Sequence, residues 1–292
     1  MYVSELTYPY KRYALHERGM RPKSFKSIMA TLRMLTDWAG TDEISRLDHN
    51  MIKDFLYWGK EEKLWEASTF RNHRQYLQSF FAWCIKQQLI KSNPIDGIEK
   101  PKLPKRVPRG LSKQDTQTVL NSARWYPWHY NSEALRNETI LYTFTYTGLR
   151  LEELLGLEDT DINLKSREIL VRQGKGQKDR VVPIHPKLAP ILEGYNEGRK
   201  YKSRHYFTGA NSQLRLYPKD LQVVCRKLSA ETGIKFTPHT LRHTFGRLCI
   251  EAGWSIYKIK EVMGHADIST TQRYLHASTE NIKTTFDEID LL

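Results

Sequence analysis

The stretch EKPKLPKRVPRG, residues 99–110, divides the chain into two parts. It contains three prolines, one glycine and five basic residues. This composition disfavours helices and strands and is typical of an extended linker. The chain has 292 residues, which is enough for two domains that each bury a core of their own. We therefore expect an N-terminal domain over residues 1–98 and a C-terminal domain over residues 111–292.

The part before the linker is predicted to be a small helical bundle. Residues 24–40, SFKSIMATLRMLTDWAG, place apolar side chains at helical spacing and end on Gly40, which suits a helix C-cap. Residues 68–90, STFRNHRQYLQSFFAWCIKQQLI, carry a second apolar stripe, with Ser68 as the expected N-cap. Both patterns favour helices that bury one face.

The opposite face of the second helix carries polar side chains that could contact DNA, because their chemical types can reach phosphates and base edges. With two basic residues of the linker, the candidate DNA contacts are Arg71, His73, Arg74, Gln75, Gln78, Lys105 and Arg106. The same helix face would equally suit exposure to solvent.

The part after the linker is predicted to mix helices with a small sheet. Ser112 suits a helix start, and the apolar segment NETILYTFTYTG ends at Gly148. Two β-branched runs, residues 168–172 and 180–184, are separated by QGKGQKD, which has the composition of a hairpin turn. Pro183 places the second run at an edge of the sheet. The fold class we expect is mainly α with a small β-sheet.

Charge and cysteine content indicate the kind of partner and compartment. Forty-six lysines and arginines against 33 acidic residues give a formal net charge of +13, which favours an anionic partner. The basic residues lie in structured-looking segments, so nucleic acid is favoured over a membrane surface. A basic protein without such a ligand is the alternative. The three cysteines form no C-x-x-C pair, and no leader or membrane span is evident, so we expect a soluble cytoplasmic protein.

Two polar residues share one face of a helix predicted for TPHTLRHTFGRLCIEAG, residues 237–253. Thr237 and Pro238 form a strong start signal. Helical spacing places Leu241 and its apolar partners on one face and His239 and Arg242 on the other, so we expect the latter two to point away from the core. Arg242 could then clamp one oxygen of an anion while the imidazole donates to another.

Two further polar residues follow a second short helix. SIYKIKEVM stops at Gly264, which puts His265 on a fixed corner just beyond the helix. The sequence STTQ, residues 269–272, fits a capping box, and Tyr274 falls early in the helix that this box begins. Taken alone, such a tyrosine is usually a packing residue.

The order H-x-x-R, then G-H, then a tyrosine nine residues later resembles the C-terminal signature of the tyrosine recombinases, the lambda-integrase type of site-specific recombinase. TYTGLRLEELLGL, residues 145–157, resembles the first arginine box of that family, with Glu153 in its acidic position. GKGQKDRVVPI, residues 174–184, resembles its hairpin. The catalytic set that the resemblance implies is Arg150, Lys175, His239, Arg242, His265 and Tyr274.

The resemblance also implies a role for each residue. Tyr274 attacks a DNA phosphate, which gives a 3′-phosphotyrosyl link and releases a 5′-hydroxyl. His239 assists removal of the phenol proton, while Lys175, or Lys178 on the same turn, protonates the leaving oxygen. His265 contacts a nonbridging oxygen or orients the tyrosine.

Charge neutralisation is left to the arginines and their neighbours. Arg150 and Arg242 suit the negative charge that builds on the phosphate during transfer. Glu153 is expected to hold a neighbouring cation, although an exposed surface ion pair is the ordinary alternative. The scheme needs no metal and no cofactor, and no phosphate-cradling ATP motif is present.

The resemblance covers nearly the whole chain and extends to assembly. It implies an N-terminal SAM-like core-binding domain, a catalytic domain and a homotetramer on two DNA sites. In the tail STENIKTTFDEIDLL, residues 278–292, an apolar stripe could dock on a neighbouring protomer or pack on its own domain. The stripe consists of Phe286, Ile289, Leu291 and Leu292.

Several alternatives remain at this point. The chain could be an idle DNA-binding accessory protein, a type IB topoisomerase or, least favoured, a metal-dependent nuclease. Within the recombinases, Xer-like dimer resolution and movement of a mobile element are both consistent with the compact length. The aromatic segment ARWYPWHYN, residues 123–131, has no assigned role.

Overall fold

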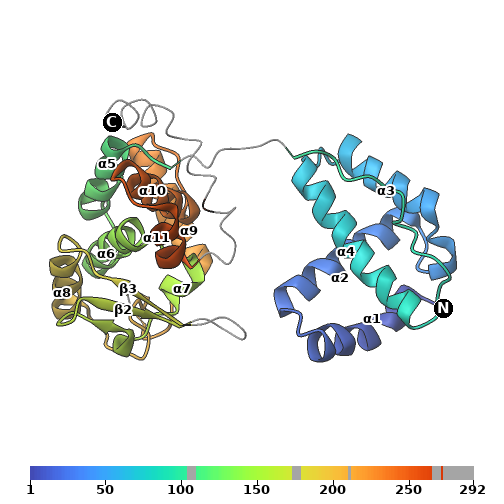
Figure 1. The fold of residues 1–292 in the computed structure, drawn as a ribbon, viewed down its shortest axis with the longest axis horizontal. Helices are drawn as coiled ribbons and strands as arrows, with labels where there is room; N and C mark the ends of the chain where they lie inside the picture. The colour runs from blue at the N-terminus through green and yellow to red at the C-terminus, as the bar shows by residue number, and fades with distance from the viewer. Residues whose placement is uncertain (104–109, 173–178, 210–211, 265–270, 272–292) are drawn as a thin grey trace, which may run out of the picture. The chain divides into compact units, whose positions relative to one another are not determined.

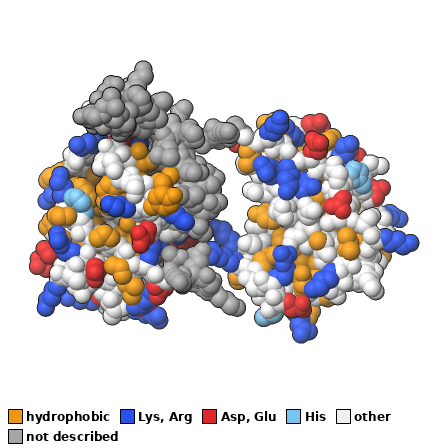
Figure 2. All heavy atoms as spheres, viewed as in Figure 1, with side chains coloured by type: hydrophobic (Ala, Val, Ile, Leu, Met, Phe, Trp, Pro, Cys, Tyr) orange, Lys and Arg blue, Asp and Glu red, His pale blue; other side chains and the backbone are white. Residues whose placement is uncertain are grey.

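The computed structural model describes the chain apart from residues 104–109, 173–178, 210–211, 265–270 and 272–292. The chain divides into two compact units, residues 1–105 and 106–292, drawn in Figure 1. Lysine and arginine side chains are spread over the visible face of each unit, interrupted by hydrophobic and acidic side chains (Figure 2). None of the described helices is both long and apolar enough to cross a membrane.

The first unit is a helical bundle. Its helices are α1 (Val3–Arg12), which continues as a π-helical turn (Tyr13–Glu17), α2 (Pro22–Ala39), a 3-10 turn (Ile44–Arg46), α3 (His49–Glu61) and α4 (Ala67–Lys86). As expected, α2 ends at Gly40, which has φ of +62°. The expected cap of α4 differs: the N-cap is Glu66, and Ser68 lies in the first turn.

The core of this unit is rich in aromatic side chains. Tyr10 of α1 is fully buried, and its ring lies edge-on to that of Phe80 of α4, with the ring centres 5.2 Å apart. Such an edge-to-face pair adds to the stabilisation from burial alone. Trp65, just before α4, packs on Phe55 of α3 at 5.7 Å. This anchor fixes where the chain enters α4.

The second unit combines helices with one small sheet. Its elements are α5 (Lys113–Trp125), α6 (Asn131–Thr147), α7 (Leu151–Leu155), a 3-10 turn (Asp159–Asp161), β1 (Ile162–Asn163), β2 (Glu168–Val171), β3 (Arg180–Pro183), α8 (Ala189–Gly198), α9 (Pro218–Thr232), α10 (Pro238–Glu251) and α11 (Ile256–Met263). The strands are antiparallel in the order β1-β2-β3, with Ile169 opposite Val182. The expected hairpin and the edge position of Pro183 are confirmed, whereas the two-residue β1 was not expected.

Helix α6 runs through the centre of the second unit and packs against α5, α8 and α10 (Figure 1). Because it is covered on several sides, its threonines are buried too, and their hydroxyls donate to the carbonyl four residues earlier; these are Thr139, Thr143, Thr145 and Thr147. The helix ends at Gly148, where φ is +61° and an added Cβ would lie 2.3 Å from the ring of Phe245. This close approach of α10 fixes the start of α7.

The aromatic segment between α5 and α6 packs on the same unit. Trp128 donates its indole N–H to the carbonyl of Ala123 at 2.8 Å. Lys227 of α9 lies 5.9 Å from the ring centre of Tyr126 and 5.6 Å from that of Trp128. These contacts join the α5–α6 connection to α9. Trp125 is 79% exposed and does not take part.

Candidate active site

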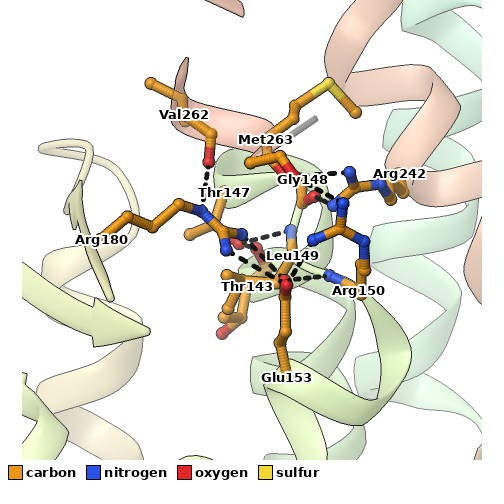
Figure 3. Close-up of polar contacts among 11 residues, drawn as sticks. Thr143, Thr147, Gly148, Leu149, Arg150, Glu153, Arg180, Arg242, Val262 and Met263 are labelled. Atoms are coloured by element: carbon orange, nitrogen blue, oxygen red, sulfur yellow. Dashed lines mark hydrogen bonds and ion pairs between the residues drawn. The ribbon is translucent and has the colours of Figure 1, made fainter. Parts of the chain in front are cut away.

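Arg150 is the N-cap residue of α7 and is held from two sides (Figure 3). Its backbone N–H donates to Glu153 Oε2 at 2.8 Å, and its Nη1 donates to Glu153 Oε1 at 2.6 Å. Its Nη2 donates to the carbonyl of Gly264 at 2.5 Å. The side chain is nevertheless 39% exposed. The guanidinium is therefore fixed in direction and still accessible to a ligand.

Arg242 corrects the expectation that this side chain points away from the core. It is only 3% exposed, and its guanidinium donates to the carbonyls of Gly148 and of Met263, the latter at 2.9 Å. The reason is that α10 packs against both α6 and α11, so the face predicted to be free is covered. The ends of those two helices supply the carbonyls that a buried guanidinium needs.

Glu153 lies between two guanidiniums, and Arg180 is the second. Arg180 donates from Nη1 to Oε1 at 3.1 Å and from Nη2 to Oε2 at 2.8 Å, and both side chains are about one-tenth exposed, at 10% and 11%. Burial alone would raise the pKa of Glu153, but the hydrogen bonds from Arg180 and Arg150 and the charge of Arg180 lower the pKa to about 2. The carboxylate is therefore ionised at any ordinary pH.

The C-terminal end of α11 is capped by three arginines from three other elements (Figure 3). The carbonyls and their donors are Val262 with Arg180, Met263 with Arg242, and Gly264 with Arg150. The last carbonyls of a helix have no partner within it and carry the negative end of its dipole, so cations are favourable there. His265 follows directly from this capped end.

His239 lies in the first turn of α10, one turn before Arg242. Its ring centre is 4.3 Å from that of His243, at 69° to it. Desolvation, and then the charge of Arg242, lower the pKa of His239. The imidazole is therefore neutral at neutral pH and able to accept a proton.

The structure brings Arg150, Glu153 and Arg242 together, with His239 on the helix of Arg242. The other catalytic candidates, Lys175, Lys178, His265 and Tyr274, lie outside the described residues, as do Lys105 and Arg106 and the tail predicted to dock on a neighbour. In the part of the chain that is described, no group of three or more histidine, cysteine or acidic side chains is placed to hold a metal ion.

Two of the predicted DNA contacts on α4 face protein instead. Arg74 is 7% exposed, and it donates to the carbonyl of Ile98 at 2.7 Å and to Gln78 Oε1 at 2.7 Å. The segment after α4 folds back over that face, so in this structure Arg74 bonds to the protein's own carbonyls. Gln78 is half-buried as the acceptor of Arg74.

The other three candidates on α4 differ in exposure. His73 stacks on Trp65 at 4.0 Å, and its Nδ1 is 2.9 Å from Thr31 Oγ1. Arg71 is half-buried and Gln75 is exposed. These two side chains keep the surface access that a DNA contact would need.

Arg180 was not among the predicted site residues, although the sequence carries a signal for it. Side chains two apart along a strand share a face. Val182 is 1% exposed while Val181 is 53% exposed, so Arg180 lies on the buried face with Val182. A charged side chain at an inward position of a strand needs a buried partner. That pattern could have identified it.

Two family profiles match the chain. The profile of the phage integrase family covers residues 111–281, and that of the phage integrase N-terminal SAM-like domain covers residues 11–91. The chain therefore belongs to the phage integrase family, and it is a tyrosine site-specific recombinase.

Named relatives agree with this class. The tyrosine recombinase XerA of Pyrococcus horikoshii is 33% identical over 197 residues, which are 67% of this chain and 66% of that protein. The tyrosine recombinase XerC of Escherichia coli is 29% identical over 290 residues, covering 95% of this chain and 93% of the relative. These matches support a recombinase and give no support to an idle accessory protein or a type IB topoisomerase.

Solved structures share the fold. The Tn1549 transposon integrase in complex with a circular intermediate DNA has a TM-score of 0.78 at 19% identity and covers 99% of this chain and 100% of that one. A lambda integrase dimer bound to a core site has a TM-score of 0.75 at 17% identity, covering 92% and 97%. The expected fold class, mainly α with a small sheet, is confirmed.

Proposed function

We propose that this recombinase cuts and rejoins DNA through a 3′-phosphotyrosyl link to Tyr274. The phenol oxygen bonds to phosphorus, and the bond from phosphorus to the 5′-oxygen breaks. The 5′-hydroxyl of a partner strand then reverses the step and releases the tyrosine. The observation that carries this proposal is the pairing of Arg150 and Arg242 on successive carbonyls at the end of α11, immediately before His265.

In this scheme, specific residues neutralise the charge on the phosphate and transfer the protons. Arg150, with its accessible guanidinium, contacts a nonbridging oxygen of the phosphate, and Arg242 contributes its charge beside it. His239 accepts the phenol proton, a role that suits its lowered pKa. Lys175, or Lys178 as the alternate, donates a proton to the 5′-oxygen. His265 contacts the phosphate or orients the tyrosine.

We extend the proposal to the domains and the assembly. Residues 1–98 and 111–292 would grip the DNA as a core-binding domain and a catalytic domain joined by the linker 99–110. Four copies would act on two sites in the cytoplasm, with the tail of each protomer docked on a neighbour. The apolar residues of that tail support this exchange.

The biological task has two candidates. Similarity to XerC along nearly the whole chain supports an Xer-like role in resolving DNA dimers. Insertion or excision of a mobile element is the second candidate, because the Tn1549 transposon integrase shares the fold over all of its solved fragment, residues 82–397 of that protein. Deletion of the gene would distinguish them: a dimer-resolution role predicts multimeric chromosomes or plasmids, and the second role predicts that only the element stops moving.

The reaction itself is tested with a nicked suicide duplex. Candidate target sites come from the genomic neighbourhood of the gene, and the label is followed on a denaturing gel. We expect a covalent adduct with the wild type, unchanged by EDTA, and none with Tyr274→Phe. A folded protein that binds the site and forms no adduct would contradict the proposal, and so would an adduct that persists in Tyr274→Phe.

A further inference from the structure

We propose that Arg180 is a positioning residue of the recombination reaction, which keeps Glu153 from neutralising Arg150 and joins the hairpin strand β3 to the end of α11. The inference rests on the proposed function, because it assigns Arg150 to the phosphate. Arg180 itself does not touch the DNA in this scheme. It acts through the two groups that it holds.

The contacts of Arg180 join three elements. From the first position of β3, its Nε donates to the carbonyl of Val262 at 2.8 Å, and its two Nη atoms reach Glu153 of α7. In Figure 3, Arg180 and Arg150 approach Glu153 from opposite sides. In the sequence, Lys175 lies five residues before Arg180, and His265 comes directly after Gly264. Arg180 therefore joins the two described segments that adjoin these candidates, β3 and the end of α11.

Gly264 shows that the end of α11 is shaped around Arg180. The glycine has φ of +65°, and an added Cβ would lie 2.8 Å from Arg180 Nη1. It is required for the turn of the backbone and also for the approach of the guanidinium. Its carbonyl accepts from Arg150. Both arginines therefore depend on the same residue of the helix end.

Arg180 limits the number of hydrogen bonds that the Glu153 carboxylate accepts from the Arg150 side chain. A carboxylate and a guanidinium without other partners form a bidentate pair, with one hydrogen bond to each carboxylate oxygen. Arg180 takes one bond from each oxygen of Glu153, and Arg150 makes a single side-chain bond, from Nη1 to Oε1. Without Arg180, Arg150 can turn into the full pair and withdraw from the phosphate.

The test compares Arg180→Gln and Arg180→Lys with the wild type on the suicide duplex. We expect the single-turnover cleavage rate of Arg180→Gln at saturating DNA to fall about 100-fold, the cost of a misplaced catalytic group, while DNA affinity changes less than about threefold. Arg180→Lys should recover part of the rate, because an ammonium restores the charge beside Glu153 but not both contacts.

A matched control separates positioning from general destabilisation. Arg199 forms a similar pair with Asp159, at 2.7 and 2.6 Å, and its side chain is 6% exposed. None of its described partners belongs to the site. Arg199→Gln should lower the stability of the same unit and leave the cleavage rate within about threefold of the wild type. A rate loss in Arg180→Gln no larger than in Arg199→Gln would overturn the inference.

A second readout does not depend on activity. NMR titration of the Glu153 carboxyl carbon should give a pKa of about 2 in the wild type and a higher value in Arg180→Gln, or in Arg180→Lys if the former does not fold. An unchanged pKa would overturn the inference even if cleavage fell. If the wild type forms no adduct, the proposed function fails and the inference with it. If the wild type reacts and Arg180→Gln reacts equally well, the inference alone fails.

Discussion

A single carboxylate, Glu153, organises the polar groups of the site. It accepts from two guanidiniums and from the backbone N–H that begins α7, so all of its bonding is charge-assisted or to a helix end. Such groups are strongly stabilising while ionised, because loss of the charge leaves buried donors without a partner. The pH dependence of unfolding is the direct measure of that stabilisation.

The predicted acid sensitivity follows from the depressed pKa of Glu153. A shift from the ordinary 4.5 to about 2 corresponds to about 3 kcal/mol. This stabilisation is present above pH 4.5 and is lost as the pH falls from 4.5 to about 2. Urea unfolding should therefore show Glu153→Gln to be about 3 kcal/mol less stable at pH 7, with the difference shrinking below pH 4.5.

Glu152 provides the control for this experiment. It is the neighbouring residue, 69% exposed, and pairs with Arg215 at the surface. Glu152→Gln should change the free energy of unfolding by less than about 1 kcal/mol at any of these pH values. A Glu153→Gln variant as stable as Glu152→Gln at pH 7 would show that the Glu153 carboxylate does not stabilise the fold.

At the scale of elements, helix ends position the site. The end of α6 at Gly148 sets the direction of α7, and the Gly148 carbonyl accepts from Arg242. The end of α11 supplies three further carbonyls, one to each of the three arginines. The sequence predicts these ends well, because each depends on one local residue, such as Thr237 as the N-cap of α10 or Gly264 after α11. Such signals act within a few residues and need no knowledge of the fold.

The burial of Arg242 and Arg74 could not be predicted in the same way. Helical periodicity assigns charged residues to the solvent side, and in both cases the carbonyls that accept them come from segments far along the chain. The two-residue strand β1 escapes prediction for a related reason, since only its pairing with β2 defines it. Predictions for the residues outside the described part of the chain remain predictions.

A glycine pair tests the fit of α6 against α10. Gly148→Ala should cost about 2–4 kcal/mol in urea unfolding, because it adds left-handed strain and overpacks the ring of Phe245. Gly233, the C-cap of α9, has φ of +71° and no atom within 4 Å of an added Cβ, so Gly233→Ala should cost only about 1 kcal/mol. Equal losses in both variants would mean that α10 can move away from α6 without cost.

At the scale of the molecule, the described residues form a separate core in each unit, and these two cores share no buried apolar residue. Arg74 matters at this scale, because it fixes the segment that leads out of the first unit. Its Nε and Nη2 donate to the carbonyls of Ile98 and Ile95, and His49 Nδ1 is 3.1 Å from the carbonyl of Pro94. The last described turn of that unit is thus attached to α4 and α3.

Substitution of Arg74 should therefore affect folding and not DNA contact. Arg74→Ala leaves two buried carbonyls without a donor, and we expect unfolding of the first unit to become easier by about 2–3 kcal/mol. The slope of log affinity against log salt should not change, whereas loss of a phosphate contact would reduce it by about one. Arg71→Ala, on the same helix, is the control that should leave stability nearly unchanged. A smaller salt slope for Arg74→Ala would restore Arg74 as a phosphate contact.

The arginine-capped end of α11 has a consequence for the free protein. Three positively charged side chains around one site repel one another, and without a bound anion they would ordinarily move apart. In this structure, the negative end of the helix dipole and the carboxylate of Glu153 offset the repulsion between the three guanidiniums. The offset is therefore present in the folded protein before any DNA binds. In the proposed reaction, the phosphate then contacts Arg150, and the bonds of the arginines to the end of α11 stay in place. A substitution that frays the last turn of α11 should consequently lower the cleavage rate much more than it lowers the affinity for DNA.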